Sequence, residues 1–170
     1  MNIYFQNLLK KIKNKQINIA VFGIGHVGIK LVLALAEKNC NVTCFDQDKK
    51  KLKKISEGKS PFSYIPDNQI KNIRKKLFFQ KSYKDVAKAD IIIMCLPTPL
   101  TNNKPDLSHI KKCWENIKNF IKKGQLIILE STTYPGCTEE IFLGQLQKKF
   151  KIDSEFFLSY SPERENPGDA

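Results

Sequence analysis

Apolar and polar residues form short blocks along the chain, and the blocks alternate between two spacings. Compact apolar runs rich in Ile and Val predict buried strands over residues 17–22, 41–45, 77–80, 90–96, 125–129 and 155–160. Apolar residues at helical spacing predict helices over residues 27–37, 48–57, 67–77, 83–89, 106–123 and 138–150. Gly58 is expected to end the second helix and Asp67 to cap the third. This alternation predicts an α/β fold with a doubly wound, Rossmann-like parallel sheet in three αβα layers.

The first 16 residues stand outside this alternation. Their apolar positions recur at helical spacing, so residues 1–16 are expected to form an amphipathic leader helix before a domain over residues 17–170. A chain of 170 residues has room for one core, whereas an enzyme with its site between two domains usually needs about 250. Any chemistry that requires a second domain is therefore expected to come from elsewhere.

A glycine motif follows the first predicted strand and opens the next helix. It reads Gly23-Ile24-Gly25-His26-Val27-Gly28, and Asp46 follows the second strand, 18 residues after the last glycine. In dinucleotide-binding folds the glycines allow a tight turn, a close pyrophosphate and close helix packing, while the acid accepts ribose hydroxyls. The motif predicts an NAD site, and a carboxylate at Asp46 disfavours the 2′-phosphate of NADP. The alternative is a glycine turn that serves packing alone.

Three further polar segments follow predicted strands, where ligands bind in open α/β sheets. Residues 95–100 either present Thr98 to a cofactor or form a rigid strand exit. The hydroxyls of residues 130–136 either position a substrate oxygen or water, or serve turn and capping chemistry. Residues 160–169 contain three carboxylates, an arginine and two prolines, and form either a charged-ligand site or a solvated tail. The residues themselves leave each of these pairs open.

Charge and cysteine content narrow the possible partners and compartment. The net charge of +12 would suit a polyanion, but the lysines are scattered over nearly every segment, so no nucleic-acid partner is expected. Five cysteines without a CxxC pair predict reduced thiols, a cytoplasmic protein and no metal site. No apolar run approaches the roughly 20 residues of a membrane span, so no membrane partner is expected.

Taken together, these segments resemble the amino-terminal, NAD-binding domain of the UDP-glucose/GDP-mannose dehydrogenase family. Within the family, the resemblance is greatest to the bacterial branch that oxidises UDP-N-acetylglucosamine in surface-polysaccharide biosynthesis. The similarity covers about residues 17–170. Its motifs lie in residues 21–28, 63–65, 95–100, 105–108, 129–136, 138–140 and 156–168.

The resemblance implies a function and a set of site residues. Family members oxidise the C6 alcohol of a nucleotide sugar to a carboxylate in two NAD-dependent steps, through a thiol-bound intermediate. The cofactor-binding residues implied here are Gly23, Ile24, Gly25, His26, Val27, Gly28, Asp46, Lys51, Pro97, Thr98 and Thr132. Thr132 is also implied to order a catalytic water, Glu163 to act as a catalytic acid/base at the substrate, and Arg164 to lie on the substrate side.

The chain also departs from the family pattern. His26 stands where the family commonly has Tyr, and is expected to be a tolerated replacement, with a pH-dependent role as the alternative. The family's nucleophilic Cys lies in a segment beyond this domain. Of the five cysteines, Cys137 at a helix start is the one whose pKa could be lowered, yet it is expected to be a turn residue.

The chain is therefore expected to be a truncated cofactor-binding part, without the central and UDP-binding domains and inactive alone. Its expected substrate is a UDP-sugar held mostly by the absent domains, and a homo-oligomer is expected only if the central domain is supplied. The alternatives are a UDP-glucose or GDP-mannose 6-dehydrogenase fragment, a Rossmann-fold polyanion-binding module, and a relic that folds poorly.

Overall fold

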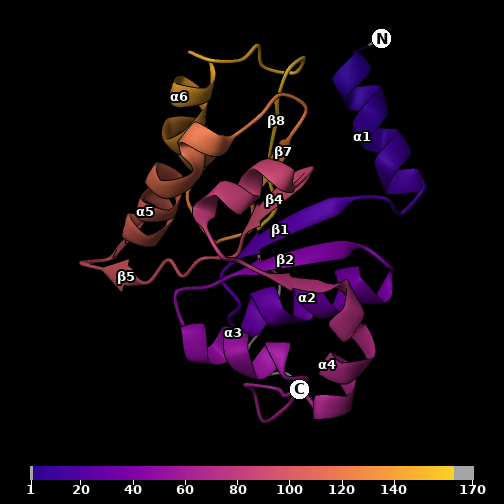
Figure 1. Cartoon of the computed structure of the whole chain (residues 1–170). Helices are drawn as coiled ribbons and strands as arrows, with labels where there is room; N and C mark the ends of the chain where they lie inside the picture. The colour runs from indigo at the N-terminus through magenta and orange to yellow at the C-terminus, as the bar shows by residue number, and fades with distance from the viewer. Residues whose placement is uncertain (1, 163–170) are drawn as a thin grey trace.

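The computed structural model describes residues 2–162 and contains one six-stranded parallel sheet (Figure 1). Its strands are β1 (Asn18–Phe22), β2 (Asn41–Phe45), β3 (Leu77–Phe79), β4 (Ile91–Met94), β7 (Leu126–Leu129) and β8 (Phe157–Tyr160). They lie side by side in the order β3-β2-β1-β4-β7-β8, and every pairing is parallel. The chain runs outward from the central strand β1 to β3, returns to the centre at β4, and runs outward on the other side to β8. The prediction of a doubly wound sheet is therefore confirmed.

Helices cover both faces of the sheet. They are α2 (His26–Glu37), α3 (Lys49–Ser56), α4 (Asp67–Ile73) and α5 (Ser108–Ile117), with the short α6 (Gly144–Leu146). Successive strand residues point to opposite faces, so Ala20 and Phe22 pack toward α5, whereas Ile19 and Val21 pack toward α2, α3 and α4. The sheet is thus the middle of three layers, with a separate hydrophobic core on each side (Figure 1).

The predicted leader helix is present as α1 (Ile3–Lys13), and it packs on the sheet near the amino ends of the strands. Leu8 is buried, the Phe5 ring lies edge-on to Phe157 of β8, and Asn2 donates to two backbone carbonyls of residues 153 and 154 at 2.8 Å each. Lys11 pairs with Asp90 just before β4. These contacts attach α1 to the sheet directly.

Two predicted helices have different boundaries in the structure. The segment 67–77 ends as α4 at Ile73, because a 3-10 turn over Arg74–Lys76 leads directly into β3. Asp67 is not the cap: Pro66 is the N-cap residue, and the Asp67 carboxylate accepts from the Ser60 amide at 2.7 Å. In the segment 106–123, α5 ends at Ile117, because a 3-10 turn follows it. The backbone of Ile121 is extended, and its side chain is buried.

Two other segments are less regular than predicted. Residues 83–89 form a 3-10 helix, η2 (Tyr83–Lys88), and residues 138–150 form the π-helical turn η4 (Glu139–Leu143) followed by α6. A hairpin of β5 (Leu100–Thr101) and β6 (Lys104–Pro105) was not predicted. Its turn residues Asn102 and Asn103 both have positive φ, which suits Asn in a two-residue hairpin.

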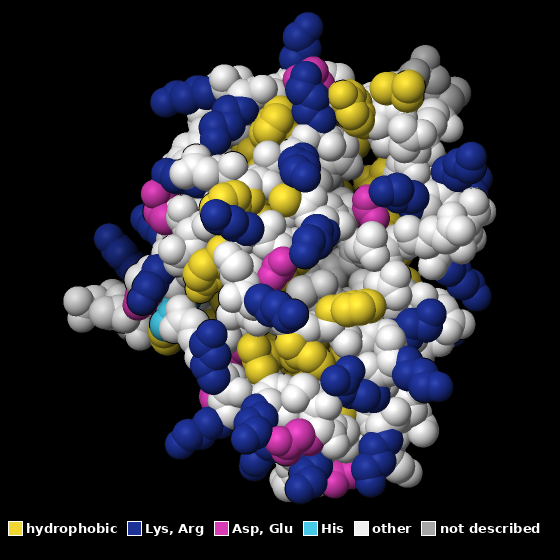
Figure 2. All heavy atoms as spheres, in the orientation of Figure 1, with side chains coloured by type: hydrophobic (Ala, Val, Ile, Leu, Met, Phe, Trp, Pro, Cys, Tyr) yellow, Lys and Arg dark blue, Asp and Glu magenta, His cyan; other side chains and the backbone are white. Residues whose placement is uncertain are grey.

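The lysine-rich composition is spread over the surface. On the face shown in Figure 2, Lys and Arg side chains lie apart from one another, with acidic and apolar groups between them. Within the part of the chain that the structure describes, the helices are all too short or too polar to cross a membrane.

Candidate functional site

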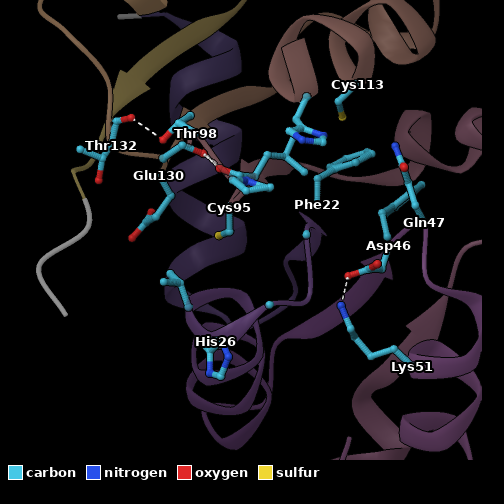
Figure 3. Close-up of a pocket in the computed structure, with 18 of the residues that line it drawn as sticks. Phe22, His26, Asp46, Gln47, Lys51, Cys95, Thr98, Cys113, Glu130 and Thr132 are labelled. Atoms are coloured by element: carbon cyan, nitrogen blue, oxygen red, sulfur yellow. Dashed lines mark hydrogen bonds and ion pairs between the residues drawn. The ribbon is translucent and has the colours of Figure 1, made fainter. Parts of the chain in front are cut away.

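A cavity of about 520 Å³ opens at the carboxyl ends of β1, β2, β4 and β7 (Figure 3). Because the sheet winds outward in both directions from β1 and β4, this is the position at which a doubly wound fold binds its ligand. The cavity is lined by most of the residues predicted to bind the cofactor: Gly23, Gly25, His26, Val27, Asp46, Lys51, Pro97, Thr98 and Thr132.

The glycine turn between β1 and α2 is shaped by close backbone approaches. Gly23 has a φ of +86°, and a Cβ there would lie 2.3 Å from the Cys95 carbonyl oxygen. At Gly28 a Cβ would lie 1.9 Å from the Gly23 carbonyl oxygen. At Gly25, in contrast, a Cβ would meet no atom within 4 Å. Gly23 and Gly28 therefore allow close packing of the backbone, and Gly25 leaves open space in front of the helix.

That open space faces the amino terminus of α2. Gly25 is the N-cap residue, and no side chain caps the helix. The backbone N–H groups of the first turn and the helix dipole therefore favour an anion at this end. The open position at Gly25 and the uncapped helix together fit a pyrophosphate, as the motif predicted.

Asp46 is held at the cavity by three hydrogen bonds. Its Oδ2 accepts from the Ile24 amide at 2.8 Å and from Lys51 Nζ at 3.0 Å, and its Oδ1 accepts from the Asp48 amide at 2.8 Å. A carboxylate has about four acceptor positions, so one remains, on Oδ1, for a ribose hydroxyl. Lys51 also lines the cavity, and its ammonium is a hydrogen-bond donor beside this carboxylate. The side chain of Ile24 is buried, and its backbone N–H donates to the Asp46 carboxylate.

Thr98 and Thr132 come together on the other side of the cavity (Figure 3). The Thr98 hydroxyl donates to the Thr132 carbonyl oxygen at 2.7 Å. Beside them, the buried Ser131 hydroxyl donates to the Leu96 carbonyl at 2.7 Å and accepts from the Leu96 amide at 3.0 Å. The loops after β4 and β7 are thereby joined into one wall of the cavity.

His26 lies at the rim of the cavity against an aromatic loop. Its Nδ1 is 2.8 Å from the Tyr64 hydroxyl, and the two rings stack with centroids 5.4 Å apart. The Phe62 ring also packs against His26, and Lys30 Nζ lies 5.9 Å from the Tyr64 ring centroid. The loop over residues 60–66 is therefore attached to the glycine turn.

The buried thiols are poor nucleophiles. Burial is the main cause that raises the pKa of Cys44 to about 12, that of Cys113 to about 12, and that of Cys137 above its usual value. A raised pKa keeps each thiol protonated near neutral pH. The alternative of a lowered pKa at Cys137 is therefore wrong, because the side chain is buried. Glu163 and Arg164 lie outside the described residues.

One residue of this wall, Glu130, had no role in the sequence-based prediction. It lines the cavity directly after β7. It belongs to the segment 130–136, in which only the hydroxyls, including that of the buried Ser131, were predicted to have a function. The signal available for Glu130 was its place directly after a predicted strand, which is also the place of Asp46.

Comparison with known proteins matches residues 17–170 to the family described as "UDP-glucose/GDP-mannose dehydrogenase family, NAD binding domain". The chain is 36% identical over 155 residues to Protein CapL of Staphylococcus aureus, and this alignment covers 89% of this chain and 36% of that protein. It is 35% identical over 158 residues to the UDP-N-acetyl-D-glucosamine 6-dehydrogenase of Pseudomonas aeruginosa, covering 91% and 37% respectively. The chain thus spans little more than a third of these relatives.

Solved structures show the same relationship. The UDP-D-ManNAc dehydrogenase of Pyrococcus horikoshii is 28% identical with a TM-score of 0.81, over 89% of this chain and 37% of that one. The NDP-N-acetyl-D-galactosaminuronic acid dehydrogenase of Methanosarcina mazei Go1 is 27% identical with a TM-score of 0.81, over 98% and 38%. The fold, the glycine turn with Asp46 and the family match agree, and the chain therefore belongs to the UDP-glucose/GDP-mannose dehydrogenase family, in which it corresponds to the NAD-binding domain.

Proposed function

We propose that this chain is the cofactor-binding part of an NAD-dependent UDP-N-acetylhexosamine 6-dehydrogenase. The observation that carries the proposal is the cavity, which has Asp46 on one side, the Thr98–Thr132 pair on the other, and the uncapped amino terminus of α2 between them. A dinucleotide has a ribose, a pyrophosphate and a second nucleoside in the same order. When bound, NAD supplies the hydride acceptor for the alcohol.

Each part of the cavity has a distinct task in this proposal. Asp46 and Lys51 hold the adenosine ribose, and the first turn of α2 holds the pyrophosphate. Pro97, Thr98 and Thr132 border the nicotinamide, and Thr132 also orders a water at the reacting carbon. Beyond the described residues, Glu163 serves as the acid/base, and Arg164 lies on the substrate side.

The proposed substrate is a UDP-N-acetylhexosamine, with UDP-N-acetylglucosamine first. Support comes from relatives whose names specify UDP-N-acetyl-D-glucosamine, at 35% and 31% identity. Other relatives carry the name UDP-N-acetyl-D-mannosamine dehydrogenase, one of them at 32% identity, so the shared chemistry is a UDP-linked N-acetylated hexose. Because the family resemblance places the nucleophilic Cys in a segment beyond this domain, residues 1–170 alone are expected to bind NAD without oxidising the sugar. Burial raises the pKa of the thiols of Cys44, Cys113 and Cys137, which agrees with this expectation.

Calorimetric titration of residues 1–170 tests the cofactor site. NAD+ is expected to bind, and NADP+ to bind at least tenfold more weakly, because its 2′-phosphate would face the Asp46 carboxylate. Asp46→Asn is expected to weaken NAD+ binding by about tenfold, the value of one hydrogen bond to a charged group. Glu139→Gln makes the same charge change on an exposed helix and is expected to leave the affinity unchanged. A folded domain that does not bind millimolar NAD+ would contradict the proposal.

A further inference from the structure

The two halves of the sheet place one carboxylate each at matching positions. In the first half, β2 pairs with the central strand β1, the last pair is Phe22 with Phe45, and Asp46 follows. In the second half, β7 pairs with the central strand β4, the last pair is Met94 with Leu129, and Glu130 follows. Glu130 is therefore the topological counterpart of Asp46.

Both carboxylates face the same cavity. Among residues 2–162, Asp46 and Glu130 are the acidic residues that line it, and Figure 3 shows them on opposite sides. The Glu130 amide donates to the Met94 carbonyl oxygen at 2.9 Å, which fixes its backbone at the carboxyl edge of the sheet. Its side chain is partly buried beside Thr98 and Thr132.

The cofactor has a matching symmetry. A dinucleotide carries two ribose rings joined by a pyrophosphate, and each ribose of NAD presents a pair of adjacent hydroxyls. With the pyrophosphate at the amino terminus of α2 and the first ribose at Asp46, the second ribose falls over the half of the sheet that ends in Glu130. A carboxylate is an acceptor-only group, which suits two hydroxyl donors.

We propose that Glu130 binds the hydroxyls of the nicotinamide-side ribose, as Asp46 binds the adenosine ribose. The assignment rests on the proposed cofactor site and adds to it the residue that fixes the second nucleoside. In this arrangement the two carboxylates hold the two ends of the dinucleotide, and the uncapped helix holds its middle.

Three ligands separate this role from the alternatives: NAD+, ADP-ribose, which keeps the second ribose but lacks nicotinamide, and ADP, which lacks both. Calorimetry is applied to the wild-type chain, to Glu130→Ala and to Glu130→Gln. Glu130→Ala is expected to weaken NAD+ and ADP-ribose by about tenfold and to change ADP by less than about twofold. Glu130→Gln keeps one acceptor oxygen without the charge, so its losses are expected to be smaller than those of Glu130→Ala. Glu139→Gln is the matched control, and thermal melting checks that each variant is folded.

Each other outcome overturns the assignment in a recognisable way. If Glu130→Ala weakens NAD+ alone, the carboxylate acts on the charged nicotinamide ring and not on the ribose. Equal losses for all three ligands would show a general effect on the cavity, and unchanged affinities would show no contact. If wild-type protein binds none of the three, the proposed cofactor site itself fails, and this inference fails with it.

Discussion

Gly25 and Gly28 lie three residues apart in one turn, yet a side chain would have different consequences at each. A Cβ at Gly28 would overlap the Gly23 carbonyl oxygen, whereas a Cβ at Gly25 would enter the open space in front of α2. Gly25 has a φ of −83°, which alanine adopts without strain. At the residue scale, structural and ligand-binding glycines can therefore be separated by experiment.

The paired substitutions Gly25→Ala and Gly28→Ala test this separation. Gly28→Ala is expected to destabilise the fold by about 1–3 kcal/mol or more, because backbone atoms have to move apart. Gly25→Ala is expected to keep the wild-type melting temperature but to weaken NAD+ binding, since the methyl group occupies space needed by the pyrophosphate. Thermal melting and calorimetry on both variants measure the two effects. A Gly25→Ala protein with wild-type NAD+ affinity would show that the phosphates lie elsewhere.

How far the site could be predicted differs from residue to residue. Asp46 was predictable because a strand, a glycine turn and a second strand all precede it in the expected spacing. Glu130 was not, because its segment also contains Ser and Thr hydroxyls, and composition does not say which side chain faces the cavity. The Tyr64 contact with His26 depends on a loop that folds back across 38 positions of sequence, which no local pattern contains.

At the scale of elements, α1 is held by a few specific contacts on the sheet. Leu8 is its buried residue, while Ile3 is 68% exposed on the same helix. The cofactor cavity lies at the opposite end of the strands, since α1 packs near their amino ends and the cavity opens at their carboxyl ends. The contribution of α1 to stability is therefore separable from its effect on binding.

Alanine substitutions at Leu8 and Ile3 test whether α1 contributes to stability without affecting NAD+ binding. Leu8→Ala is expected to destabilise the protein by about 2–4 kcal/mol, because it removes buried methyl groups and leaves a cavity. Ile3→Ala, the exposed control, is expected to change stability by less than about 0.5 kcal/mol. Urea unfolding monitored by circular dichroism measures both values, and NAD+ affinity is expected to be unchanged. A Leu8→Ala protein as stable as the control would mean that burial of Leu8 does not stabilise the fold.

Periodicity predicted the strands well and the helix ends poorly, for a physical reason. Strands such as β1 and β4 are buried on both faces, so their sequences are continuous apolar runs with few alternatives. Helix ends depend on backbone turns instead. Ile121 continues the apolar spacing of α5 and is buried, although the chain has already left the helix. Gly144 lowers helix propensity in the segment where a long helix was expected.

At the scale of the whole molecule, the net charge of +12 is distributed over the surface. On the face in Figure 2 the Lys and Arg side chains are spread over the surface. The main effect of their charges is therefore electrostatic repulsion between side chains that are not in contact. Such repulsion destabilises the compact state and is screened by salt. The charge therefore bears on stability, and the scattered arrangement gives no support to a polyanion-binding face.

Raising sodium chloride from about 0.02 M to about 0.3 M shortens the Debye length from roughly 20 Å to below 10 Å. The melting temperature of the unliganded domain is expected to rise over this range, because repulsion among lysines is screened more than the short ion pairs are weakened. Differential scanning calorimetry measures the shift, with potassium chloride as the check that it depends on ionic strength. A fall in melting temperature would show that ion pairs such as Lys51–Asp46 outweigh the repulsion.

The Ser131 hydroxyl has a consequence for motion. It bonds both backbone groups of Leu96, and Thr98 bonds the backbone of Thr132, so the loop after β4 is fastened to the loop after β7 at two points. One loop can shift without the other only if these hydrogen bonds break. A displacement of the segment that carries Glu130 that keeps them therefore carries Thr98 with it.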